Sequence, residues 1–140
     1  MENKDLKEVY DEMYKQGSTA WFSQGEEERE LILKMGEPWK DKKVLEIGCG
    51  EGELASRIYE KEADITANDY SITAIDTAEA KYERYFKPFP HSEDGKYLVF
   101  IHGNYKKLKS GYNRIVMQGV LEHLDDPFTE LKWMMDNLLS

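Results

Sequence analysis

The sequence predicts an α/β fold in which a parallel sheet carries helices on both faces. Short apolar segments alternate along residues 44–140 with segments whose apolar residues recur at helical spacing, and this alternation is typical of βαβ units. A glycine-rich turn at residues 48–52 joins the first apolar segment to a helical one. Because the chain has 140 residues, of which 40% are hydrophobic, we expect a single domain over residues 1–140.

Residues 1–43 are expected to form an N-terminal helical appendage of this domain. Residues 4–16 carry apolar side chains at the spacing of an amphipathic helix. A second helix is expected from about Gly25 to Met35, because three glutamates suit the positive end of the helix dipole and because Gly36 and Pro38 follow.

Residues 44–140 are expected to form the core of the fold. The apolar segments predict strands at residues 44–47, 64–68, 97–102 and 114–118. The amphipathic segments predict helices from the glycine turn to about residue 59, over 71–86 and over 127–139, the last with Pro127 in its first turn. Two prolines and a glycine within residues 87–96 predict an exposed loop.

The composition excludes several classes of protein. A net charge of −9 repels phosphate backbones and anionic lipids, so no nucleic-acid or membrane partner is expected. A single cysteine, Cys49, excludes an intramolecular disulfide. The N-terminus is polar and no apolar run approaches the length of a membrane span, so we expect a soluble, cytoplasmic protein.

The glycine turn and an aspartate after the next strand predict a nucleoside site. Glycines allow a ligand to approach the backbone closely, and the helix that follows offers free N–H groups. Asp69 ends the second strand, where a carboxylate binds ribose hydroxyls in doubly wound sheets. The alternative role for Asp69 is to cap the helix that begins near Ser71. Glu53 stands where the dinucleotide fingerprint has its third glycine, which disfavours an NAD-dependent dehydrogenase.

Four segments resemble the motifs of class I S-adenosylmethionine-dependent methyltransferases. Val44–Gly52 resembles motif I, an acidic residue followed by Gly-x-Gly-x-Gly, and Asn68–Ile72 resembles the segment after strand two. His102–Tyr105 resembles the segment after strand three, and Arg114–Leu124 resembles strand four with the Val-Leu-Glu-His signature of the small-molecule branch. The resemblance implies a Rossmann-like sheet in the order 3-2-1-4 that lacks the family's C-terminal strands.

The resemblance also implies roles for individual residues around the cofactor. Glu46 would hold the methionyl amino group and Asp69 the ribose, while Gln118 would lie on the floor beside the methionine tail. The glycine turn would lie along the methionine moiety, with Cys49 as a small filler; its residues are Gly48, Cys49, Gly50 and Gly52. Asn104, in place of the usual aspartate, and Tyr105 would frame the adenine. Tyr70 would either pack on the adenine face or be a core aromatic.

The implied reaction is methyl transfer from S-adenosylmethionine to an oxygen or nitrogen of a small molecule. His123 would be its general base or, alternatively, a structural residue that orients Glu122. No metal is expected, because two adjacent residues rarely make a site. The alternative function is a non-catalytic S-adenosylmethionine-binding module, or a fragment that needs a partner to complete its sheet.

Two further expectations concern surfaces. We expect residues 114–140 to be covered by a second copy in a homodimer, by a partner chain or by a C-terminal part. The aromatic residues Tyr10, Tyr14, Trp21 and Phe22 would belong to a lid over the cofactor, as in related enzymes, or would pack on the sheet.

Overall fold

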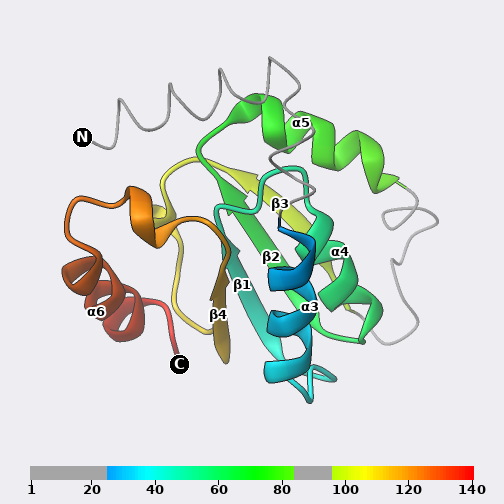
Figure 1. The fold of residues 1–140 in the computed structure, drawn as a ribbon, viewed down its shortest axis with the longest axis horizontal. Coiled ribbons are helices and arrows are strands. Elements are labelled where there is room, and N and C mark those ends of the chain that lie inside the picture. Colours follow the sequence, from blue (N-terminus) through cyan, green and yellow to red (C-terminus); the bar gives the residue numbers. More distant parts are fainter. Residues whose placement is uncertain (1–24, 84–95) are drawn as a thin grey trace.

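The structure, a computed structural model, describes residues 25–83 and 96–140. Four parallel strands form one sheet in the order β3-β2-β1-β4, which confirms the predicted order 3-2-1-4 (Figure 1). The strands are β1 (Lys43–Ile47), β2 (Asp64–Asp69), β3 (Leu98–His102) and β4 (Arg114–Met117). The central position of β1 explains its apolar sequence, because residues 44–47 are buried on both faces.

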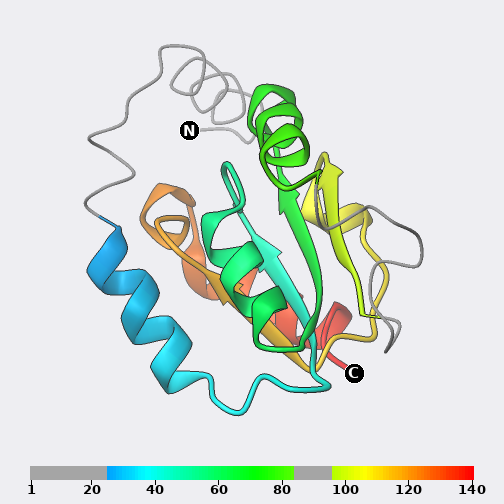
Figure 2. The same ribbon diagram turned by 90° about the vertical axis from the view of Figure 1, so that its right-hand side faces the viewer.

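Helices cover the two faces of the sheet unequally. One face carries α3 (Glu26–Met35), α4 (Glu53–Glu60) and α5 (Ile72–Lys81), and the other carries α6 (Pro127–Asn137) (Figures 1 and 2). The short helices η2 (Tyr105–Lys107) and η3 (Leu121–His123) follow β3 and β4. Each face has its own apolar core, one around Ile58, Ile65 and Phe100, the other around Leu45 and Met134.

Two helices end earlier than the sequence predicts. Helix α5 ends at Lys81, where Tyr82 leaves the helical path, packs its ring on Phe100 and donates its hydroxyl to Glu53. Helix α6 ends at Asn137, because the next residues turn into an extended segment. The predicted helix over residues 4–16, the four aromatic residues up to Phe22 and most of the loop over 87–96 lie outside the described residues.

The segment after α6 runs beside the start of β4. Leu139 forms a parallel bridge with Tyr112, and the N–H of Ser140 donates to the Tyr112 carbonyl at 2.9 Å. Met134 and Leu138 are fully buried, whereas Phe128 and Met135 stay exposed at 83% and 62%. All four residues of β4 are only half-buried. The segment 127–140 therefore buries part of its apolar surface and leaves part of it exposed, and β4 is not fully covered.

Within the described ranges, none of the helices is long and apolar enough to cross a membrane.

Candidate functional site

The glycine turn between β1 and α4 lies at the carboxyl end of the sheet, against the end of β2. The N–H groups of Gly48 and Cys49 donate to the Asn68 carbonyl at 2.8 and 2.9 Å. Gly48 and Gly52 have φ angles of +74° and +88°, a region that favours glycine. A Cβ on Gly48 would lie 2.4 Å from Val120, and one on Gly52 would lie 2.7 Å from Phe100. Backbone conformation and close packing thus both require glycine here.

Asp69 contacts this turn with one carboxylate oxygen and its own following segment with the other. Oδ2 accepts the Gly50 N–H at 2.8 Å and Oδ1 accepts the Ser71 N–H at 2.8 Å. Ser71 itself caps α5, because its hydroxyl accepts the Ala74 N–H. Asp69 is therefore not the N-cap of α5. A carboxylate has about four acceptor positions, so Asp69 retains acceptor capacity for a diol.

Glu46 lies in β1 beneath the turn and is only 2% exposed. Its Oε1 has no hydrogen-bond partner among the described residues. Burial raises the pKa of Glu46 well above its usual range, and the Asp69 charge raises it further. The Ala55 N–H in the first turn of α4 and the Arg29 guanidinium act in the opposite direction. A buried carboxyl with an unpartnered oxygen is a group that a ligand can satisfy.

The two carboxyls Glu46 and Asp69 have different electrostatic surroundings. Burial also raises the pKa of Asp69, but the N–H groups of Ser71, Gly50 and Tyr70 lower it. Backbone donors stabilise the anion of Asp69, whereas Glu46 Oε1 has no such donor among the described residues, so burial opposes the charged form of Glu46 more strongly.

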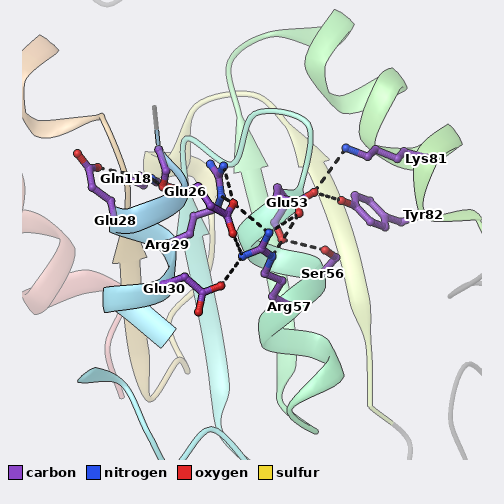
Figure 3. Close-up of polar contacts among 11 residues, drawn as sticks. Glu26, Glu28, Arg29, Glu30, Glu53, Ser56, Arg57, Lys81, Tyr82 and Gln118 are labelled. Carbon is purple, nitrogen blue, oxygen red and sulfur yellow. Dashed lines mark hydrogen bonds and ion pairs between the residues drawn. The ribbon is translucent and has the colours of Figure 1, made fainter. Parts of the chain in front are cut away.

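Sequence reasoning missed Arg29, a buried arginine of α3 with 8% exposure. Its Nε and Nη2 donate to Glu26 Oε2 at 3.2 and 3.1 Å (Figure 3). Its charge acts on Glu46, so it lies within electrostatic reach of the turn. The signal in the sequence was the spacing to Leu33, four residues later on the same buried face.

Gln118 connects the end of β4 to the start of α3. Its Nε2 donates to the Gly25 carbonyl at 2.7 Å (Figure 3). This hydrogen bond ties the segment after β4 to the N-terminal end of α3, the helix that carries Arg29.

Cys49 is buried, whereas the side chain of His123 is partly exposed. Cys49 is buried and free, and burial raises the pKa of its thiol, with Asp69 and Glu46 adding to the effect. The thiol is therefore a poor nucleophile, and its place suits a packing role. The His123 side chain is 43% exposed, with Nε2 3.9 Å from Glu122 Oε1. It lies in η3, directly beyond β4.

The residues expected around adenine follow β2 and β3. Asn104 caps η2, because its Oδ1 accepts the Lys106 N–H at 2.9 Å. Tyr105 is buried with its hydroxyl donating to Glu130, and its ring meets Trp133 edge-on with centroids 5.9 Å apart. Tyr70 is half-buried, and burial, Glu130 and Asp69 raise its pKa to about 12. Tyr70 and Tyr105 contribute to the core on the α6 face.

Across residues 25–83 and 96–140, no group of three or more His, Cys, Asp or Glu side chains is placed to hold a metal ion. The turn has two buried carboxyls beside it, and the charge of the buried Arg29 acts on one of them. These groups can offer opposite charges to a ligand that carries both an anionic and a cationic group.

Comparison with known proteins points to one family. Residues 22–139 match a family described as a methyltransferase domain. The mitochondrial ubiquinone biosynthesis O-methyltransferase of Schizosaccharomyces pombe is 31% identical over 99 residues, which are 69% of this chain and 34% of that protein. The chain therefore spans about a third of the length of this curated relative.

Solved structures show the same fold. The magnesium protoporphyrin IX methyltransferase of Synechocystis PCC 6803, with S-adenosylmethionine bound, has a TM-score of 0.64 at 16% identity, over 84% of this chain and 55% of that one. An S-adenosylmethionine-dependent methyltransferase of Mesorhizobium loti has a TM-score of 0.60 at 17% identity, over 79% of this chain and 47% of that one. The matched part of this chain thus corresponds to about half of each of these solved chains.

Proposed function

The chain belongs to the family of class I S-adenosylmethionine-dependent methyltransferase domains, and from this premise we propose that it binds S-adenosylmethionine at the glycine turn as the cofactor half of a small-molecule methyltransferase. The observation that carries the proposal is the contact between the Gly50 N–H and the Asp69 carboxylate above the buried Glu46. When bound, the cofactor supplies a methyl group on a sulfonium that is activated for in-line displacement.

The amino acid end of the cofactor fits Glu46 and Arg29. Glu46 has a buried oxygen without a partner among the described residues, which would accept from the cofactor's ammonium group. Arg29 is a buried cation whose charge acts on Glu46, and it would pair with the carboxylate of the same amino acid. Opposite charges at the two ends of this short zwitterion would fix its direction along the turn.

The nucleoside end fits Asp69, with Asn104 and Tyr70 as proposed neighbours of the adenine. Asp69 already accepts two backbone N–H groups, which fix its orientation, and its remaining lone pairs would accept the two ribose hydroxyls. Preorganisation of this kind lowers the cost of binding, because the carboxylate loses little freedom when the ribose arrives.

The residues for the transfer itself lie beyond β4. His123 is exposed at the carboxyl end of the sheet and is the proposed base for an acceptor hydroxyl or amine. A small-molecule acceptor is supported by the Val120–His123 signature and by the net negative charge of the chain. Methyl transfer mainly requires alignment of the nucleophile and exclusion of water, so the acceptor side of the site would control specificity.

The second candidate function is cofactor binding without catalysis. The chain spans 34% of its curated relative, and the half of the neighbouring structures that it does not match would carry acceptor contacts. Turnover separates the two functions: S-adenosylhomocysteine should accumulate with a metabolite extract as acceptor only if the chain is catalytic.

Calorimetry with S-adenosylhomocysteine tests the binding proposal. We expect binding by the unmodified chain and a loss of roughly 1–3 kcal/mol in Asp69→Ala, which removes hydrogen bonds to a charged group. Undiminished affinity in this variant would exclude Asp69 from the site. NADH binding of equal strength would contradict the proposed ligand.

We also propose that residues 114–140 are covered in the working protein by a second copy or by a further part of the domain. The exposed Phe128 and Met135 on α6 and the half-buried strand β4 support this proposal.

A further inference from the structure

We propose that Glu26, Arg57 and Glu53 are positioning residues that set Arg29 against the amino acid end of the cofactor site. The inference rests on the proposed function, because it assigns a purpose to the ion pairs behind Arg29. These residues come from α3 and α4, two helices on the same face of the sheet, and their side chains point toward one another (Figure 3).

Glu26 is the bridge between two arginines. Its Oε2 accepts from Arg29 Nε and Nη2 at 3.2 and 3.1 Å. The same carboxylate receives Arg57, with Nη1 at 2.7 Å from Oε1 and Nη2 at 3.0 Å from Oε2. A two-point contact with a planar guanidinium fixes the plane of a carboxylate. Arg57 therefore fixes Glu26, and Glu26 fixes the guanidinium of Arg29.

Arg57 is in turn fixed at the first residue of α4. Its Nε and Nη2 donate to Glu53 Oε1 at 3.2 and 2.9 Å, and Glu53 directly follows Gly52, the last residue of the glycine turn. The other oxygen of Glu53 accepts the Tyr82 hydroxyl at 2.8 Å. The contacts thus run from Tyr82, at the end of α5, through Glu53, Arg57 and Glu26. They end at Arg29 (Figure 3).

The arrangement of these residues suits positioning. The side chains of Arg57, Glu26 and Glu53 are 26%, 45% and 38% exposed, so solvent screens each single pair, while the two-point contacts and the shared Glu26 join the pairs into a network of fixed geometry. Arg29, at the end of the chain of contacts, is buried and shares α3 with Glu26. Arg29 is proposed to contact the amino acid end of the ligand, so a change in the position of its guanidinium should affect a ligand that carries this end and not a ligand that lacks it.

This difference yields a test with two ligands. S-adenosylhomocysteine carries the amino acid end, whereas 5′-methylthioadenosine carries the same nucleoside without it. In Arg57→Met we expect affinity for S-adenosylhomocysteine to fall about tenfold, as for coupled network residues, and affinity for 5′-methylthioadenosine to stay the same. Calorimetry measures both, and thermal unfolding confirms that the variant is folded.

A double-mutant cycle then asks whether Arg57 acts through Arg29. In an Arg29→Ala background, Arg57→Met should have no further effect on S-adenosylhomocysteine binding. Glu26→Gln keeps the shape of the bridge, removes its charge and should reproduce the ligand-selective loss if Arg57→Met fails to fold. Lys132→Met is the matched control, because it breaks an exposed ion pair with Asp136 on α6, and it should change neither affinity.

Each result decides the inference. A ligand-selective loss that vanishes without Arg29 supports it. Equal losses for both ligands would show general loosening of the turn and overturn it, as would unchanged binding of S-adenosylhomocysteine in both Arg57→Met and Glu26→Gln. If the unmodified chain binds neither ligand, the proposed function fails, and this outcome is distinct from a failure of the positioning role.

Discussion

Because Glu46 is buried, its ionisation makes the unfolding free energy depend on pH in a way that an exposed glutamate does not. Its pKa is raised in the folded chain above the value of 4.5 for a free glutamate, so the folded state holds a proton that the unfolded state has lost. The unfolding free energy must therefore fall as pH rises from about 4.5 to the folded pKa, with a limiting slope of about 1.4 kcal/mol per pH unit, and level off above it.

Glu46→Gln should remove this dependence, because glutamine has nearly the same shape and no charge. We expect the variant to be more stable than the unmodified chain at neutral pH and equally stable at low pH. Urea denaturation across the pH range measures both. Glu79→Gln, an exposed position on α5, is the control and should leave the pH profile unchanged. An unaltered profile in Glu46→Gln would show that another group carries the slope.

Single residues were predictable where a local motif named them. Glu46 and Asp69 follow from their positions beside the glycine turn, and the structure brings both to the carboxyl end of the sheet. Arg29 did not follow, because the glutamates around it in the sequence resemble an ordinary solvated face. Its proposed role depends on its contact with Glu26, and Glu26 is in turn held by Arg57, a residue far along the chain that no local pattern records.

Among the elements, the junction between the glycine turn and α4 is the most tightly constrained. Gly52→Ala would place a Cβ at a φ of +88° and 2.7 Å from Phe100. We expect a loss of roughly 2–5 kcal/mol, the sum of backbone strain and overpacking. Gly103→Ala is the matched control: it has a φ of +129° but no heavy atom within 4 Å of the added Cβ, so it should show strain alone. Thermal unfolding compares the two.

Equal losses in the two glycine variants would mean that the contact with Phe100 relaxes without cost.

The elements themselves were largely predictable, and their ends were not. Apolar alternation located all four strands and the helices on both faces, because burial imposes the same periodicity on sequence and structure. Helix α5 ends early because Tyr82 turns into the core and bonds to Glu53. Helix α6 ends early because Leu139 pairs with Tyr112. Both stops are tertiary contacts, which helix propensity does not contain.

For the whole molecule, several exposed apolar side chains bear on the proposed covering of residues 114–140. Phe128 and Met135 are exposed on α6, and Leu31 and Met35 are exposed on α3. Light scattering on the 140-residue chain should show a dimer or a larger species, because apolar surface of this kind associates in water. Mutation of Phe128 and Met135 to serine should shift the population toward the monomer. A stable monomer at high concentration would contradict the proposed covering of residues 114–140.

The position of β1 in the middle of the sheet also fixes the order in which the domain can assemble. Lys43 bonds to Asn113 across 70 positions of the chain, whereas the partners of β1 in β2 follow soon after it. On a ribosome, β1, the glycine turn and Asp69 therefore emerge well before β4. Closing so long a loop is entropically costly and slow. The nascent chain accordingly has the proposed nucleoside site early. One flank of its central strand stays unpaired, exposed to chaperones or to misassembly, until β4 is made.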